Sequence, residues 1–318
     1  MDGVKDEIVS GTWRGRARCA GWLLMLLTCA LMMQGCGADL SASQPRSRHQ
    51  AALERAFPDP RAQALAIAAE RGDAAEVRRL MQDEGVNPDL IFGGQDGGMP
   101  LLAWPIYSQS PDGLRAMLAA GADPNVKRQY FANGKTRARA NAMVWAAEQD
   151  DPIYLAILLE HGGDPNTRNA NDESLLFHAF IKQNKWRNIR LLVERGADVN
   201  ALAGMGGTLV GHYASNGGFE MVHWLLEHGA DPTLDYAYGK PVYRLNSHTI
   251  EGVFWHPGDP DAPSWQLNSQ RWLLARGFDR PPMPKHYREM REVFGFEYEE
   301  SRIPLPSVDK ESRHVQHP

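Results

Sequence analysis

The histidines are the side chains of this 318-residue chain best suited to acid–base or metal chemistry, but their spacing predicts no catalytic centre. Catalysis would need a nucleophile beside a base, paired carboxylates or clustered metal ligands. His223 and His228 stand five residues apart, and the sequence has neither a His-Glu-x-x-His nor a Gly-x-Ser-x-Gly motif. The glycine-rich residues 204–207 follow no strand pattern, so we do not expect a dinucleotide site. We therefore expect no enzyme activity, cofactor, metal site or small-molecule substrate.

The cysteines are confined to the N-terminal region, at Cys19, Cys29 and Cys36. No thiol follows Cys36, which excludes a disulfide framework or a cysteine-based zinc site from the body of the chain.

An apolar run at residues 20–33 follows three arginines and ends shortly before Cys36. A basic flank, a short apolar stretch and small residues at its end are typical of a secretory signal, whereas a membrane-spanning helix needs roughly 20 apolar residues. The order Met-Gln-Gly-Cys at residues 33–36 resembles the lipobox of bacterial lipoproteins, which implies lipidation of Cys36. We expect a signal peptide over 1–35, a lipidated cysteine with its linker over 36–63, and a lipoprotein of the outer membrane facing the periplasm. An uncleaved anchor or a buried N-terminal helix is the alternative.

A short phrase, Gly-Ala-Asp-Pro-Asn, recurs along the rest of the chain. Its glycines stand 36, 41, 34, 33 and 48 residues apart, and each phrase follows a leucine-rich stretch with helical spacing. A glycine after such a stretch supplies the left-handed conformation that ends a helix. Copies of the phrase begin at Gly85, Gly121, Gly162, Gly196, Gly229 and Gly277.

This period, together with a small-residue helix before each leucine-rich one, resembles the ankyrin repeat. The resemblance implies an all-α solenoid of about five to six helix-pair repeats with long finger loops, over residues 64–280. We expect a terminal helix at 286–294 and a disordered tail from Arg302, both within a C-terminal region spanning 281–318.

Two departures from the repeat suggest contact sites. The finger at residues 126–140 is longer than its neighbours and contains basic and aromatic side chains without an acidic one. It is a candidate contact for an acidic partner, anionic lipid headgroups or, least favoured because export is expected, nucleic acid, with a solvated insertion as the alternative. The second departure is an expected loop at 246–265, whose aromatic residues we expect to cap the stack, with a binding role as the alternative. The finger candidates are Lys127, Arg128, Tyr130, Phe131, Arg137 and Arg139.

The ankyrin resemblance also implies that partners contact the positions just after the small residues of each first helix. Here those positions include Glu148, Gln149, Lys182, Ser215 and Asn216.

We therefore expect a protein partner and a lipid anchor in the membrane. The net charge of −5 argues against nucleic acid. One version resembles immunity lipoproteins, which neutralise an exported toxin. The other is a periplasmic scaffold for an envelope or stress-defence enzyme.

Overall fold

The computed structural model describes residues 48–90, 99–126, 141–203, 206–258 and 263–307, with the backbone alone of 129–132 and 135–138. The chain divides into two units, Met1–Arg46 and Ser47–Pro318, and the described residues belong to the second. Cys36 and the expected signal peptide lie outside the described residues.

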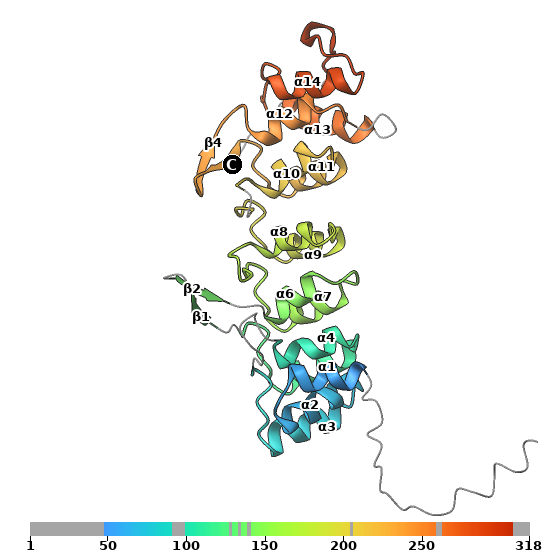
Figure 1. Ribbon diagram of the computed structural model, residues 1–318. Helices are drawn as coiled ribbons and strands as arrows, with labels where there is room; N and C mark the ends of the chain where they lie inside the picture. Colours follow the sequence, from blue (N-terminus) through green and yellow to red (C-terminus); the bar gives the residue numbers. More distant parts are fainter. Residues whose placement is uncertain are drawn as a thin grey trace, which may run out of the picture. The chain divides into compact units, whose positions relative to one another are not determined.

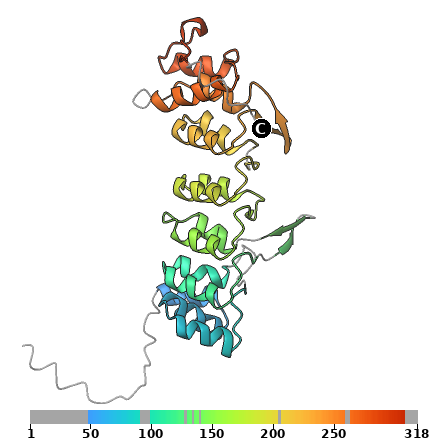
Figure 2. The same cartoon turned by 180° about the vertical axis from the view of Figure 1, so that it is seen from behind.

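Helices dominate the second unit, and most of them form antiparallel pairs of a first and a second helix (Figures 1 and 2). Within the described residues there are six such pairs, in agreement with the expected all-α repeat fold. They are α2 (Pro60–Glu70) with α3 (Ala74–Arg78), α4 (Trp104–Tyr107) with α5 (Pro111–Ala119), α6 (Ala142–Ala147) with α7 (Ile153–Glu160), α8 (Leu175–Ile181) with α9 (Trp186–Glu194), α10 (Leu209–Ser215) with α11 (Phe219–Glu227), and α12 (His248–Trp255) with α13 (Pro263–Ala275).

Single helices and short turns complete the unit. Helix α1 (Arg48–Ala56) precedes the first pair and α14 (Lys285–Val293) follows the last. A π-helical turn, η1 (Arg79–Asp83), extends α3, while the 3-10 turns η2 (Leu101–Ala103) and η3 (Glu300–Arg302) precede α4 and follow α14.

Polar caps and glycines set the ends of these short helices. Ser174 and Thr208 precede α8 and α10, and each side chain accepts a hydrogen bond from a backbone N–H in the first turn. After the second helices, Gly162 and Gly196 adopt positive φ values of 85° and 92°, a conformation that costs glycine little. The recurring phrase is thus the point where one repeat ends and the next finger begins.

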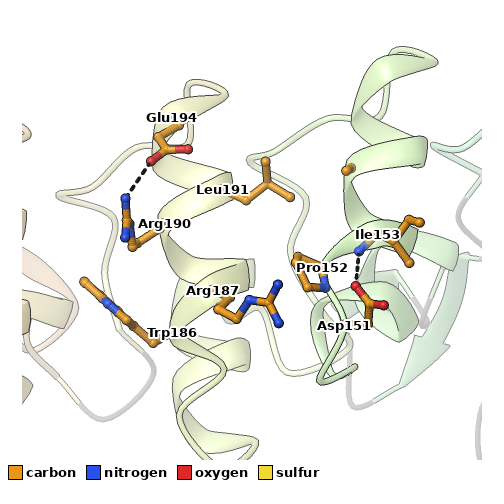
Figure 3. A pocket seen from close by; sticks show the side chains of 9 residues that line it. Asp151, Pro152, Ile153, Trp186, Arg187, Arg190, Leu191 and Glu194 are labelled. Atoms are coloured by element: carbon orange, nitrogen blue, oxygen red, sulfur yellow. Dashed lines mark hydrogen bonds and ion pairs between the residues drawn. The ribbon is translucent and has the colours of Figure 1, made fainter.

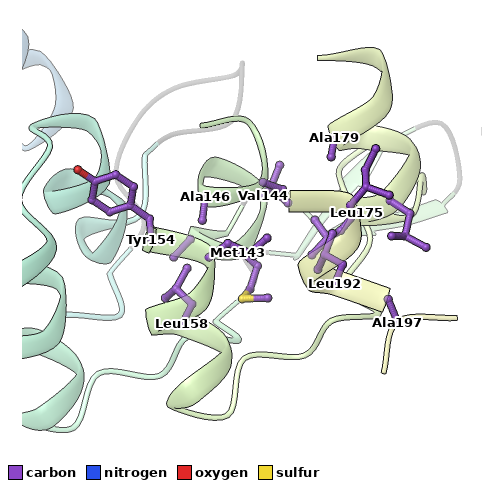
Figure 4. Packing of buried hydrophobic residues seen from close by; sticks show 14 of the residues in the cluster. Met143, Val144, Ala146, Tyr154, Leu158, Leu175, Ala179, Leu192 and Ala197 are labelled. Carbon is purple, nitrogen blue, oxygen red and sulfur yellow. The ribbon is translucent and has the colours of Figure 1, made fainter. Parts of the chain in front are cut away.

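The core runs between successive helix pairs, because a single pair of such short helices cannot bury its apolar face. Leu158, Leu175 and Leu192 are fully buried, and Met143 lies between neighbouring helices (Figure 4). Aromatic rings continue the packing from α8 and α9 to α10 and α11. Phe180 meets Tyr213 edge-on at 5.0 Å between ring centroids, and Trp186 meets Trp224 at 5.3 Å.

The helical stack begins earlier than residue 64, so the linker predicted for 36–63 is too long at its C-terminal end. Leu53 of α1 and Phe57 are buried in the core, and Asp59 caps α2. The sequence of α1 did not indicate a core helix, because the helix is mostly polar and buries a single residue.

The predicted loop at 246–265 is also wrong in its first half, because residues 248–255 form α12, the first helix of the last pair. Ser247 caps this helix, and Phe254 and Trp255 lie in the core. Trp265 lies on α13 and is 39% exposed. The long final interval between glycines instead contains a β-hairpin.

Two hairpins form fingers on one side of the stack (Figures 1 and 2). Strands β1 (Gln129–Ala132) and β2 (Lys135–Ala138) pair antiparallel, as do β3 (Leu234–Ala237) and β4 (Lys240–Tyr243).

The expected tail is ordered as far as residue 307. Arg280 donates to the backbone oxygen of Ile303 at 2.7 Å, which ties this segment to the last repeat. Residues 308–318 lie outside the described residues.

Candidate protein-interaction surface

The central fingers are joined by a repeated hydrogen-bonding unit built from one asparagine in each phrase. The Nδ2 of Asn166 donates to the Gly196 oxygen at 3.2 Å, and its Oδ1 accepts from the Asp198 N–H at 2.7 Å. Asn125 makes the same pair of bonds to Gly162 and Asp164, and Asn200 makes it to Gly229 and Asp231. The phrase is therefore a link between repeats as well as a turn, and we call this series the asparagine ladder.

Both ends of the asparagine ladder have a different residue. Asp89 accepts from the Asp123 N–H at 3.0 Å but has no amide with which to donate. Thr233 takes the asparagine position after Gly229, and its hydroxyl donates within its own turn to Asp231 at 2.7 Å. The asparagine ladder therefore ends where β3 begins, and Tyr236 of β3 instead donates its hydroxyl to the Asn200 oxygen at 3.0 Å.

The ends of the first helices carry a polar network on Glu148 and His178. The His178 Nε2 lies 2.8 Å from Oε1 of Glu148, while its Nδ1 faces the Asn169 amide nitrogen at 2.9 Å. Since the amide nitrogen of Asn169 can only donate, Nδ1 of His178 accepts its hydrogen bond, and Nε2–H of His178 donates to Glu148. This hydrogen bond, with lesser help from Lys182 at 3.4 Å, lowers the pKa of Glu148. The network leaves a carboxylate and an exposed ammonium group at the surface.

The other expected contact residues at these helix ends differ in their hydrogen bonding and exposure. Gln149 donates to the Trp145 oxygen at 2.9 Å, and Asn216 donates to the His212 oxygen at 2.7 Å. Ser215 is half-buried and hydrogen-bonds Tyr287 of α14. Among these residues, Lys182 and Asn216 are exposed, so they are the most accessible to a partner.

The basic finger at 126–140 is a hairpin in its backbone. Tyr130 pairs with Arg137 across the two strands, and Phe131 pairs with Thr136. Lys127, Arg128 and Arg139 lie outside the described residues. In the sequence, an Asn-Gly pair at 133–134 between two short segments is a typical hairpin signal.

The sequence reasoning missed the second finger, β3–β4. Tyr238 at its tip is fully exposed, and Tyr243 and Leu245 are 67% and 71% exposed. The sequence does contain a signal for this hairpin, because the Tyr-Gly pair at 238–239 stands between two β-prone segments. Residues 236–250 also contain the basic side chains of Lys240 and Arg244 and no acidic one. Both long fingers therefore combine tyrosine with cations.

A separate groove lies on the second helices, between α7 and α9 (Figure 3). Pro152, Ile153 and Leu191 contribute apolar atoms, and Trp186 and Arg187 stand at its side. Arg190 pairs with Glu194 of its own helix at 3.5 Å. This groove contains none of the predicted contact residues.

The described residues also bear on metal binding and on membrane spanning. No group of three or more histidine, cysteine, aspartate or glutamate side chains there is arranged to hold a metal ion. No helix in the same residues combines the length and apolar character needed to cross a membrane.

Comparison with known proteins identifies the repeats. Residues 142–235 match the family model for ankyrin repeats (3 copies). Protein PhlB of Serratia liquefaciens is 30% identical over 145 residues, which cover 46% of this chain and 58% of PhlB, so the match spans less than two thirds of that protein.

Two solved structures resemble the chain. The ankyrin repeat domain of Bcl-3, a member of the IkappaB family, is 24% identical with a TM-score of 0.48, covering 68% of this chain and 86% of that one. The ankyrin repeat protein EF0377 is 24% identical with a TM-score of 0.43, covering 56% of this chain and 87% of its own.

Proposed function

We propose that this ankyrin-repeat protein is a non-catalytic adaptor, held at a membrane by a lipid, which binds one protein partner along its fingers and first helices. Ankyrin repeats are protein-interaction modules, and their fold is typically a scaffold without enzymatic activity. The match over 142–235 covers the helices that bear Glu148, Lys182 and Asn216.

The observation that carries the proposal is the projection of both long hairpins from one side of the stack (Figures 1 and 2). The asparagine ladder fixes the fingers between them, so the two hairpins are presented by a braced support. Rigid presentation lowers the ordering cost of binding.

Capture from envelope extract tests the binding surface. Full-length tagged chain is compared with a variant in which Lys127, Arg128, Arg137 and Arg139 are serine. We expect the variant to lose most of the captured partner and to keep its melting temperature. The matched control replaces Arg78, Arg115, Arg187 and Arg190 of the second helices, which are exposed. Equal capture by both variants would refute the role of the basic finger.

The lipid anchor and the outer-membrane location are part of the proposal, supported by the lipobox-like residues 33–36. Several acyl chains give stable anchoring where one short chain does not. Cys36→Ser should release the chain from the membrane fraction. If fractionation stays unchanged, the lipoprotein hypothesis is wrong.

Two biological versions of the adaptor make different predictions. As an immunity protein, the chain would neutralise an exported toxin, and tethering would raise its effective concentration where the toxin acts. As a periplasmic scaffold, it would hold an envelope or stress-defence enzyme that stays active when bound. Measuring the activity of the captured partner with and without the chain separates the two.

A further inference from the structure

The two long fingers share one hairpin plan. In each, two four-residue strands pair in full register, and two residues stand between the strands. Both turn residues of the β3–β4 finger, Tyr238 and Gly239, have positive φ values of 54° and 73°, as in a type I′ turn. The Asn-Gly pair at 133–134 is the sequence that this turn type prefers. Residues at equal distances from the two turns therefore take equivalent places in the two hairpins.

One backbone hydrogen bond shows which groups of the β3–β4 finger face outward. The Arg244 N–H donates to the Thr233 oxygen at 2.9 Å, so these opposed residues form a hydrogen-bonded pair. Opposed residues of an antiparallel ladder alternate between bonded and non-bonded pairs, which makes Tyr236 and Pro241 a non-bonded pair. The backbone nitrogen of Pro241 therefore faces away from β3, and proline has no N–H to offer there.

Strand β3 is attached to the stack, so β4 is the outer strand of its finger. Asp235 of β3 is 1% exposed, and its Oδ1 lies 2.9 Å from Nδ1 of His248. The hydroxyl of Tyr236 bonds the preceding finger. In β4, by contrast, Pro241 and Tyr243 are exposed. Proline on an edge strand prevents a further strand from pairing, so Pro241 closes the outer edge of β4.

The β1–β2 finger has no such block. Thr136 takes in β2 the place that Pro241 takes in β4, as the second residue after the turn and opposite Phe131. By the same alternation, Thr136 and Ala138 are the residues of β2 whose N–H and C=O groups face away from β1. Within the described part of the chain, each hairpin is a sheet of two strands. The outer edge of β2 therefore offers backbone donors and acceptors to a further strand.

The charges of β2 decide which strand suits this edge. The register places Lys135 and Arg137 on one face of β2, and residues 126–140 contain no acidic side chain. If β2 strands of two copies of this chain paired with each other, like charges would lie opposite or diagonal to one another, which is unfavourable. A strand with aspartate or glutamate at alternate positions would place opposite charges there instead.

We propose that β2 accepts an extended acidic segment of the partner protein as a third, antiparallel strand of the β1–β2 finger. The backbone groups of Thr136 and Ala138 bond the segment, and its acidic residues lie opposite Lys135 and Arg137. In such strand addition, main-chain hydrogen bonds give affinity and the alternate side chains give specificity. The segment belongs to the partner of the proposed function, on which this inference rests.

The test uses the full chain labelled with ¹⁵N and a capped hexapeptide of alternating aspartate and valine. We expect the peptide to shift the backbone amide signals of Thr136 and Ala138 more than those of Lys135 and Arg137, which already bond β1. Thr136→Pro copies the block of Pro241 into β2 and should lower the affinity about tenfold or more. The matched control, Thr136→Val, keeps the N–H and should leave the affinity unchanged.

Methylated peptides test the same pairing without altering the chain. In the proposed register the valines lie opposite Thr136 and Ala138, so the valine N–H groups face β2 and the aspartate N–H groups face away. N-methylation of the valines should abolish binding, whereas N-methylation of the aspartates should preserve it. Lysine in place of aspartate should weaken binding about tenfold or more.

Several results would overturn the inference. They are equal loss from both methylation patterns, loss from the aspartate pattern alone, equal binding of the lysine peptide, unchanged affinity of Thr136→Pro, or no shift at Thr136 and Ala138. Self-association of the chain that Thr136→Pro abolishes, without peptide binding, would also overturn it, in favour of a second copy as the occupant.

The outcome is separate from that of the proposed function. A chain that binds the acidic peptide along β2 but captures no envelope protein keeps this edge site and loses the adaptor. A chain that captures its partner equally well with and without Thr136→Pro keeps the adaptor and loses the strand addition.

Discussion

The central fingers and the last finger begin with the same turn but use it differently. In the central fingers, the amide nitrogen and the amide oxygen of an asparagine both hydrogen-bond the next repeat. After Gly229 the corresponding residue is Thr233, whose hydroxyl bonds only its own turn, and an exposed hairpin follows. Exposed surface that a partner can contact therefore follows the point where the asparagine ladder ends.

The largest expected effect comes from removing one central link. Asn166→Ala loses two hydrogen bonds between repeats, at roughly 1 kcal/mol each, so the free energy of unfolding should fall by about 2 kcal/mol. Thr233→Ala should cost less than about 1 kcal/mol, because its bonds stay within one turn. Urea denaturation measures both, and equal losses would remove the distinction between the two kinds of finger.

Restoring a link at the other end should have a smaller effect of opposite sign. Asp89→Asn keeps the acceptor for Asp123 and adds the donor that the central asparagines direct at a glycine oxygen, here that of Gly121. It also removes a carboxyl whose pKa is raised by burial. We expect a gain of about 0.5–1 kcal/mol by the same denaturation measurement. A loss of stability would mean that this finger does not share the central geometry.

The two histidine–carboxylate pairs should differ in the pH range where they matter. The pKa of His248 is raised, so the stability contributed by its pair with Asp235 is present below the ordinary value of 6.5 and lost as pH rises through the raised pKa. The pKa of Glu148 is lowered, so its stabilisation is present above the ordinary value of 4.5 and lost as pH falls through the lowered one.

His248→Gln should therefore flatten the stability profile above pH 6.5, and Glu148→Gln should flatten it below pH 4.5. Each change should stay under about 1 kcal/mol, because His248 is 59% exposed and Glu148 is 32% exposed in their side chains. Melting temperatures across pH measure both effects. If His248→Gln changed the stability profile only at acidic pH, or Glu148→Gln only at alkaline pH, the assignment of the pairs would be wrong.

The sequence was sufficient to predict the repeats because their signals are local. The Gly-Ala-Asp-Pro-Asn phrase and its period identified the helix pairs. The asparagine ladder was not predictable, since its partners lie about one repeat away and the turn alone already explains the phrase.

The errors also have physical reasons. Helix α1 is polar on all but one buried position, so residues 48–56 resembled a linker. Pro257 and Gly258 suggested a loop, but they follow α12 and do not interrupt it. Of the contact residues, Glu148 and Lys182 do meet, whereas the pairing of Asp235 with His248 depends on the register of the β3–β4 finger.

Photo-crosslinking tests the central claim, binding of one protein partner along the fingers and first helices, most directly. A crosslinking amino acid is placed at Tyr238 on the last finger, at Lys182 on a first helix or at Arg187 on a second helix of the full chain in its own cells. We expect positions 238 and 182 to crosslink to the same protein and position 187 to give no crosslink to it. Crosslinks from position 187 alone, or from position 238 to lipid alone, would contradict this expectation.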